Sequence, residues 1–299
     1  MDRYAIKVKH TVPTFIYITL GSVAGLALLR WWVIEFELLH MKEEVWHIWI
    51  PLAFPFIPVT LWLRPRLRVL TFAENEDNGR FGFQVIAIIT IGVMIAVSQV
   101  YLSSATGKLV AAKTFSEVEK SGKEKFYTID SFGVVRKTGR WHSKIHTSGR
   151  YNKYLNFTLY YVCAISDSDT YNRARTYTWW CALKFEKQMS NRSSEATKDA
   201  EYDAFYRESM YRASTYNYRD VKYFERVPHS DDRDNFLRAA SGEGNRINES
   251  FEILEPVRTP FESRDNSTFA WIFGTFFIGA TTFLLLLIWP GYSSSSAKS

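Results

Sequence analysis

Four long apolar stretches constrain this chain more than any other feature of its sequence. They cover residues 13–33, 45–63, 81–101 and 269–289. Each is close to the roughly 20 residues that an α-helix needs to cross about 30 Å of hydrocarbon. Buried helices of a water-soluble protein are the alternative, but four segments of spanning length argue against it. The sequence therefore predicts an integral membrane protein with four transmembrane helices, whose first partner is the lipid bilayer.

The second stretch is the least regular of the four. It contains Pro51, Pro55 and Pro58, and each proline removes a backbone donor and tends to kink a helix. Membrane helices tolerate prolines where neighbouring groups satisfy the freed carbonyls. We expect a kinked span at 45–63, with a re-entrant hairpin as the alternative.

Basic residues in the short loops predict the orientation. Lysine and arginine in such loops mark the cytoplasmic side of a membrane. The connection between the first two stretches holds four glutamates and a single basic residue, Lys42. The basic residues outside that connection gather before the first stretch and between the second and third: Arg3, Lys7, Lys9, Arg64, Arg66, Arg68 and Arg80. Both termini are therefore predicted to be cytoplasmic, and residues 102–267 extracytoplasmic.

Residues 102–267 are numerous enough to form a folded domain of their own. Strand-like runs are predicted at 126–129, 132–135, 141–146, 154–165, 176–185, 221–227 and 251–257, with a turn at Lys137–Arg140. Helices are predicted at 193–210 and after Ser230, which is a good N-cap, with Gly242 as the stop signal. Strands first and helices later predict an antiparallel α+β domain. Its aromatic strand residues Tyr160, Tyr161, Trp179 and Trp180 are candidates for core on one face and contact surface on the other.

The overall charge says little about partners. The formal net charge is +6 over 299 residues, and the positive residues look spread along the chain rather than gathered in a stripe. A nucleic-acid partner is therefore not expected.

Cys163 and Cys181 are the only two cysteines, and both lie in the predicted extracytoplasmic domain. They fall in two strands that we expect to pair as a hairpin, so a disulfide is one alternative in an oxidising compartment. Two small hydrophobic side chains on one core face are the other alternative, which we slightly favour because spacing alone does not fix the register of the two strands.

Two groups of ionisable residues are candidates for a metal or ion site. His142 and His146 have the H-x-x-x-H spacing of a helical metal site, but the local pattern is a strand without an acidic third ligand. His40, His47 and the glutamates of residues 35–44 are expected to form an ordinary polar loop at the membrane surface. Arg30 is expected to extend its charge to that surface. No cofactor or metal site is predicted.

Small residues predict where helices approach closely. Gly21 and Gly25 form a G-x-x-x-G pattern in the first stretch, and we interpret it as a packing contact within the bundle. Ala270 and Gly274 repeat the spacing in the last stretch.

Three phrases carry a resemblance to a known family: YLNFTLYYVCAI, KFEKQMSNR and YFERVPHSDDRDNF. With the arrangement of spans, they resemble the long N-terminal region of rhomboid-family proteins of the bacterial, Bacteroidetes type. The resemblance implies a multi-pass protein of a bacterial inner membrane, and the accessory part of such a protein. Rhomboid proteases use a serine in G-x-S-G, which does not occur here. The nearest match, His146–Gly149, lacks the first glycine, so no catalytic residue is carried over.

The function expected from these observations is not catalytic. The first hypothesis is a membrane protein whose extracytoplasmic domain binds or presents a protein partner, or associates with itself. The second is the accessory region of an intramembrane protease whose catalytic core is not in this chain. A small transporter or channel is a weaker third, because the third and fourth stretches contain no charged residue.

Overall fold

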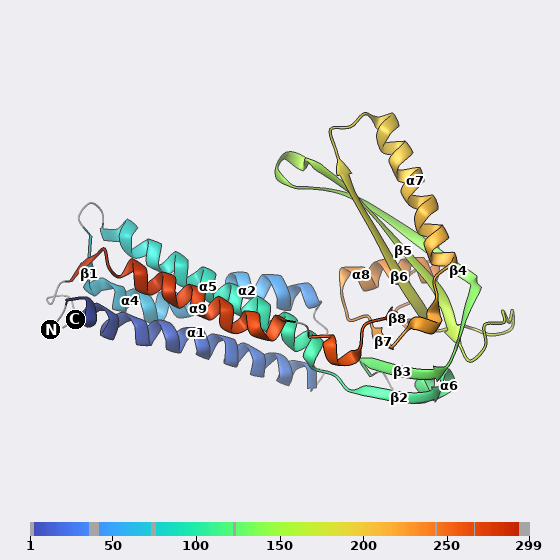
Figure 1. The fold of residues 1–299 in the computed structure, drawn as a ribbon, viewed down its shortest axis with the longest axis horizontal. Helices are drawn as coiled ribbons and strands as arrows, with labels where there is room; N and C mark the ends of the chain where they lie inside the picture. Colours follow the sequence, from blue (N-terminus) through green and yellow to red (C-terminus); the bar gives the residue numbers. More distant parts are fainter. Residues whose placement is uncertain are drawn as a thin grey trace. The chain divides into compact units, whose positions relative to one another are not determined.

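The computed structural model describes residues 3–35, 42–72, 76–121, 124–242, 244–265 and 267–292. The chain forms two compact units (Figure 1). One consists of Met1–Thr106 with Asp265–Ser299, and the other of Gly107–Arg264. We call the first the membrane unit and the second the sheet domain.

The membrane unit contains the four predicted helices. The main ones are α1 (Arg3–Glu35), α5 (Glu76–Ala105) and α9 (Thr268–Leu286). The segments long and apolar enough to cross a membrane are Arg3–Val33, Val45–Val69, Asp77–Ala105 and Phe261–Leu286. Many large apolar side chains on these helices point away from the bundle, among them Leu52, Phe277 and Ile278. Such a surface is stable where lipid covers it, which agrees with the predicted membrane protein.

The proline-rich second span is one irregular helix. It runs through η1 (Val45–Trp49), α2 (Ile50–Ala53), α3 (Phe56–Pro58), η2 (Val59–Leu63), α4 (Arg64–Arg66) and η3 (Leu67–Val69). Two of these pieces, η1 and η2, are π-helical turns beside the prolines, where wider turns accommodate the missing donors. The backbone at the junctions between these pieces stays in the right-handed helical region, so the re-entrant hairpin is not found.

Aromatic and polar contacts fasten α9 to α1 and α5. The ring of Phe283 stacks on Phe15 with centroids 4.5 Å apart and meets the edge of Phe83 at 5.3 Å. The buried Lys7 ammonium donates to the carbonyls of Leu287 and Pro290, which follow the end of α9. A cation there also interacts favourably with the helix dipole. A short pairing of β1 (Leu70–Thr71) with β9 (Gly291–Tyr292) closes this end of the unit.

The glycines that pack the bundle are not the predicted ones. A side chain at Gly21 or Gly25 would meet nothing within 4 Å, because both face away from the described part of the unit. A Cβ at Gly279 would overlap the Thr90 side chain, and one at Gly92 would lie 2.8 Å from the Pro51 carbonyl oxygen. The prediction of a bundle contact at Gly21 and Gly25 is therefore wrong. Ala270 and Gly274 also make no such close approach: the nearest atom to a Cβ at Gly274 is on Trp271, one turn away on the same helix, at 3.6 Å.

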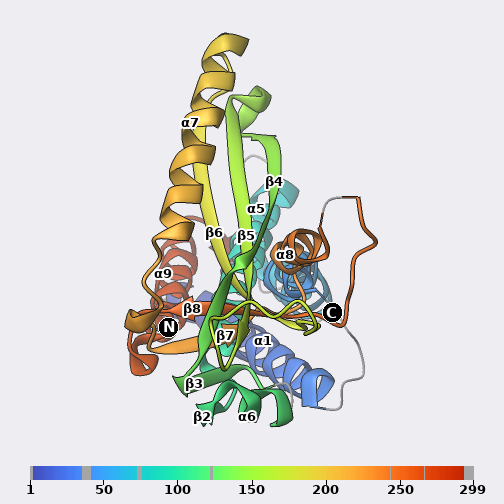
Figure 2. The same ribbon diagram turned by 90° about the vertical axis from the view of Figure 1, so that its right-hand side faces the viewer.

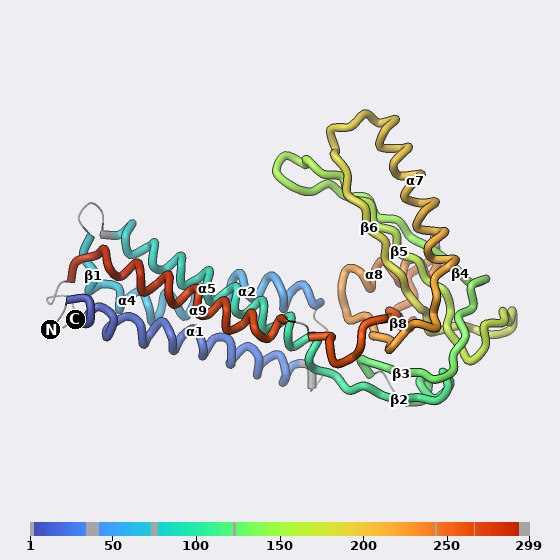
Figure 3. Tube along the Cα trace, viewed as in Figure 1, coloured from blue at the N-terminus to red at the C-terminus, as the bar shows by residue number. Residues whose placement is uncertain are grey.

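The sheet domain is built on a seven-stranded mixed sheet. Its strands are β2 (Leu109–Thr114), β3 (Phe126–Ser131), β4 (Gly133–Ser148), β5 (Tyr154–Ser166), β6 (Trp179–Ser190), β7 (Tyr223–Arg226) and β8 (Glu252–Val257). Their spatial order is β2-β3-β7-β8-β6-β5-β4. Figure 3 traces the backbone through this domain. Four pairings are antiparallel, as predicted for the α+β domain, whereas β2–β3 and β6–β8 are parallel.

Helices cover both faces of the sheet because β5 is apolar on both sides. Phe157, Leu159, Tyr161 and Cys163 belong to the core with α6 (Phe115–Lys120) and α7 (Glu195–Ser214). The alternate residues Tyr160, Val162 and Ala164 belong to a second core with α8 (Asp231–Ser241). Residues two apart in a strand share a face, so the pattern needs a cover on each side. The aromatic residues Tyr160, Tyr161, Trp179 and Trp180 are all buried, so they are not a contact surface.

The predicted turn at Lys137–Arg140 is a bulge inside one long strand. The pairing of β4 with β5 shifts between Val135 and Arg140, and regular pairing resumes at Arg140↔Val162. The Thr138 hydroxyl replaces a ladder partner there: it accepts from the Ala164 N–H at 2.8 Å and donates to the Val135 carbonyl at 2.7 Å. The caps of α8 are as predicted, with Ser230 accepting from the Arg233 N–H and Gly242 at a φ of 84°.

The close approach at Gly279 leads to a first prediction. Gly279→Leu should destabilise the membrane unit by about 1–3 kcal/mol, because the new side chain must displace Thr90. The matched change Gly25→Leu should leave the stability unchanged, since nothing lies within 4 Å of its Cβ. Unfolding in mixed micelles of dodecyl maltoside and increasing SDS measures both. Equal transitions for the two variants would contradict this packing.

Candidate protein-binding surface

Strand β4 is one of the two edge strands of the sheet, and β2 is the other. Strand β4 is the last strand in the order, and β5 is its one partner among the described strands. Figure 2 shows β6, β5 and β4 side by side, with β4 outermost. From Arg140↔Val162 to Ser148↔Tyr154 the pairing with β5 is continuous and without a bulge. The other side of this stretch therefore presents backbone N–H and C=O groups on alternate residues to whatever lies beside it.

The β4–β5 hairpin carries positive charge alone. Between Asp130 and Asp167 the sequence has no acidic residue. Its basic residues are Arg136, Lys137, Arg140, Lys144, Arg150 and Lys153. Positive charge is therefore concentrated here, which corrects the prediction of an even spread. A count of charges per predicted hairpin, rather than along the whole chain, would have found it.

Two of the six basic residues are used inside the domain. Arg136 donates to the carbonyls of Ala213, Ser214 and Tyr216, at the end of α7. Arg140 donates to the Ala240 carbonyl of α8 and lies over the Trp180 ring. The remaining four lie along the hairpin: Lys137, Arg150 and Lys153 are exposed and Lys144 is half-buried.

Apolar side chains accompany these charges on β4. Trp141 is 41% exposed and Ile145 is 52% exposed. Both lie on the face that α7 covers, because Trp141 contacts Tyr206 of α7 with ring centroids 4.9 Å apart and Ile145 is four residues further along the strand. Lys144 and His146 lie on the opposite face. The exposed part of β4 therefore has Trp141 and Ile145, with Ser143 and Thr147, on one side, and Lys144, with His142 and His146, on the other.

The predicted hairpin of β5 and β6 is present, and its register places Cys163 directly opposite Cys181. Both are buried free thiols. Cys163 Sγ is 3.4 Å from the Tyr218 hydroxyl. Burial raises the pKa of Cys163 to about 11 and raises the pKa of Cys181 and of Tyr218 well above their usual values. Thiols of this kind are core side chains rather than nucleophiles.

His142 and His146 share a face of β4 but do not form a metal site. Four residues along a strand separate them by about 13 Å, too far for one ion. His142 stacks on the Tyr160 ring at 6.4 Å. No group of three or more histidine, cysteine, aspartate or glutamate side chains that could hold a metal occurs among the residues the structure describes.

Arg30 is buried inside the membrane unit and does not extend to the surface. Its Nη1 donates to the backbone oxygen of Gln99 at 2.7 Å and to the side-chain oxygen at 3.1 Å. Its Nη2 lies 3.8 Å from a carboxylate oxygen of Glu43, and His47 Nε2 is 3.5 Å from Nη1. The prediction for Arg30 is therefore wrong, and the group joins α1 to α5 and η1. The predicted loop residues Glu37 and His40 lie outside the described residues.

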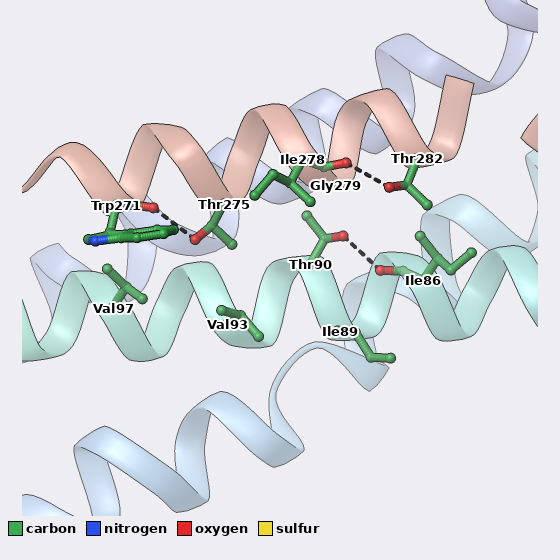
Figure 4. A pocket seen from close by; sticks show the side chains of 10 residues that line it. All are labelled: Ile86, Ile89, Thr90, Val93, Val97, Trp271, Thr275, Ile278, Gly279 and Thr282. Atoms are coloured by element: carbon green, nitrogen blue, oxygen red, sulfur yellow. Dashed lines mark hydrogen bonds between the residues drawn. The ribbon is translucent and has the colours of Figure 1, made fainter. Parts of the chain in front are cut away.

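A groove of about 460 Å³ lies between α5 and α9 (Figure 4). Thr90, Thr275 and Thr282 line it, and each hydroxyl donates to a carbonyl of its own helix. The rest of its lining is apolar: Ile86, Ile89, Val93, Val97, Trp271, Ile278 and Gly279. The groove therefore presents an apolar surface. Such a surface suits contact with lipid hydrocarbon and contains no group suited to catalysis.

A half-buried carboxyl, that of Glu255, lies near the ion pair that attaches α8 to the sheet. Asp232 of α8 accepts from the Tyr160 hydroxyl at 2.7 Å and from Lys184 at 2.8 Å. Glu255 of β8 lies opposite Glu225. Burial, with smaller contributions from Glu225 and Asp232, raises the pKa of Glu255 to about 7, while Lys184 acts in the opposite direction.

Comparison with known proteins gave no relative: no family model, no curated protein and no solved structure matches the chain. The resemblance to rhomboid-family proteins stays a prediction.

The buried cysteines lead to a second prediction. N-ethylmaleimide should not label the native protein at pH 7, because both thiols are buried and protonated. After unfolding in SDS without reductant, mass spectrometry should count two labels. A Ser250→Cys variant, whose added thiol is exposed, is the control and should gain one label in the native state. A count of zero after unfolding would show the disulfide instead.

Glu255 leads to a third prediction. Its pKa is raised on folding, so its contribution to stability is full below about pH 4.5 and is lost as the pH rises to about 7. Glu255→Gln keeps the uncharged form at every pH. The variant should match the wild type near pH 4.5 and be more stable at pH 8 by about 3 kcal/mol. Urea unfolding at both pH values measures this, with Glu249→Gln at an exposed position as control. The same difference in unfolding free energy between Glu255→Gln and the wild type at both pH values would refute the prediction.

Proposed function

We propose that this chain is a non-catalytic membrane protein whose sheet domain binds a protein partner outside the cytoplasm. The observation that carries the proposal is the edge strand β4, which combines a regular unpaired edge, exposed apolar side chains and a surplus of positive charge. Sheet edges that are neither covered nor interrupted are sites for chain pairing. The faces of the sheet cannot serve in this way, because helices cover both. The other edge strand, β2, offers six residues for pairing, against the sixteen of β4.

The chemistry of the buried groups supports a binding role over a catalytic one. The thiols and the Tyr218 hydroxyl are buried, with pKa values raised by desolvation. A nucleophile needs the opposite, a lowered pKa in a partly exposed place. The Arg30 guanidinium is engaged by Gln99 and Glu43. Neither the cluster of the two cysteines with Tyr218 nor the surroundings of Arg30 are arranged for a reaction.

The proposed location is a bacterial inner membrane, with both termini in the cytoplasm and residues 102–267 outside. The fold supports an even number of crossings, because four helices are long enough to span. Lys7 of α1 contacts the residues that follow α9, which brings the two ends of the membrane unit to the same side. The basic loops then favour the cytoplasm for that side.

Photo-crosslinking in cells tests this proposal and is the fourth prediction. A benzophenone amino acid at Ile145 or Tyr151 of the hairpin should crosslink one and the same protein, identified by mass spectrometry. The same group at Tyr211, an equally exposed position on α7, should not. The captured protein should then bind the purified chain in nanodiscs. Equal capture from all three positions, or adducts with cytoplasmic proteins alone, would refute the surface or the orientation.

A further inference from the structure

We propose that the partner binds β4 as an extended acidic segment, which pairs with residues 141–148 and becomes an eighth strand of the sheet. The inference rests on the proposed function and adds the mode of binding and the chemistry of the partner. It draws on the pairing, the charge and the two faces of the hairpin.

The edge of β4 has the regular geometry that strand addition needs. The stretch from Trp141 to Ser148 pairs with β5 residue by residue, from Trp141↔Tyr161 to Ser148↔Tyr154. It contains no proline, and the bulge lies before it. Eight extended residues span about 26 Å. An extended chain is the partner that satisfies alternating N–H and C=O groups over such a length.

The charge of the hairpin favours an acidic partner. The hairpin has six basic residues and no acidic one between Phe132 and Ile165. Like charges placed opposite each other in neighbouring strands are destabilising, so this edge opposes pairing with a second copy of itself. The same charges attract an acidic segment and speed its approach. Charge complementarity therefore selects an acidic chain over a copy of β4.

The two faces of β4 present different side chains to a new strand. Cross-strand neighbours lie on the same face of a sheet. On one face the new strand meets Trp141 and Ile145, and on the other it meets Lys144 and His146. The matching segment therefore alternates apolar and acidic residues. This pattern is more specific than a general affinity for negative charge.

Lysines on an edge strand also serve to prevent aggregation. An edge protected in this way does not need exposed apolar side chains, yet Trp141 and Ile145 are each more than 40% exposed. The apolar face indicates that the edge is prepared for a partner as well as guarded against self-pairing.

Peptide binding to the full chain is the fifth prediction. The chain is reconstituted in nanodiscs of uncharged lipid, and the probe is a fluorescent nonapeptide of alternating valine and glutamate, blocked at both ends. Fluorescence anisotropy should show saturable binding. A peptide with lysine in place of glutamate should bind at least about tenfold more weakly, which corresponds to 1.4 kcal/mol. An acidic peptide N-methylated at alternate amides keeps its charge but cannot form the backbone hydrogen bonds of strand pairing. It should therefore not bind.

Two substitutions locate the binding. Lys144→Glu on β4 should weaken the acidic peptide about tenfold. Lys222→Glu makes the same charge change at an exposed lysine just before β7 and should alter binding less than twofold. Circular dichroism and thermal unfolding establish that both variants fold like the wild type.

Several outcomes would overturn the proposal. Equal binding of the N-methylated peptide would mean that charge alone attracts it. Equal loss in both lysine variants would place binding elsewhere. Binding to anionic vesicles of phosphatidylglycerol, in place of the peptide, would identify a lipid surface as the ligand. If photo-crosslinking from Ile145 captures a partner while the peptide fails, the proposed function stands and strand addition falls. If the peptide binds and no partner is captured in cells, the proposed function falls.

Discussion

The burial of β5 on both faces is the constraint on which the sheet domain depends. Its alternate residues enter two separate cores, one under α6 and α7 and the other under α8. A strand that is apolar on both sides needs a cover on each side, as in sheets with helices on both faces. Once both faces are covered, the edges are the parts of the sheet that keep unpaired backbone groups. Because the core covers both faces of the sheet, this domain can pair with another chain at the edges of the sheet.

The membrane unit depends on a different principle, because lipid is as apolar as its side chains and gives helices no hydrophobic reason to associate. Close approach and buried polar contacts supply the association instead. Gly279 lets α9 meet Thr90, and Gly92 lets α5 meet the Pro51 carbonyl. Arg30 and Gln99 join α1 to α5 with two hydrogen bonds. Each contact joins residues distant in sequence, so a local motif such as G-x-x-x-G did not identify the packing face.

The helices and strands were predicted well from the sequence, but which of them lie side by side in the fold was predicted poorly. The four spans, the β5–β6 hairpin and the caps of α8 follow from local composition and periodicity, whereas the register that places Cys163 opposite Cys181 does not. The bulge in β4 did not, because Lys137–Gly139 has the composition of a turn and only its position in the sheet makes it part of a strand. The parallel pairing of β6 with β8 joins segments about 70 residues apart, which no local pattern reports. The edge position of β4, and with it the candidate site, depends on this same long-range order.

The charge of the hairpin also helps a membrane-anchored chain to keep the β4 edge of its sheet domain free of pairing with other copies. A membrane protein is confined to a surface, which raises its local concentration and favours edge-to-edge pairing between copies. Six basic residues without an acidic one oppose that pairing, because two copies of the edge bring like charges near each other. The same residues leave the edge available to a chain of opposite charge. One feature therefore both excludes the commonest wrong partner and selects the right class of segment, which is how specificity is obtained at an edge that recognises backbone.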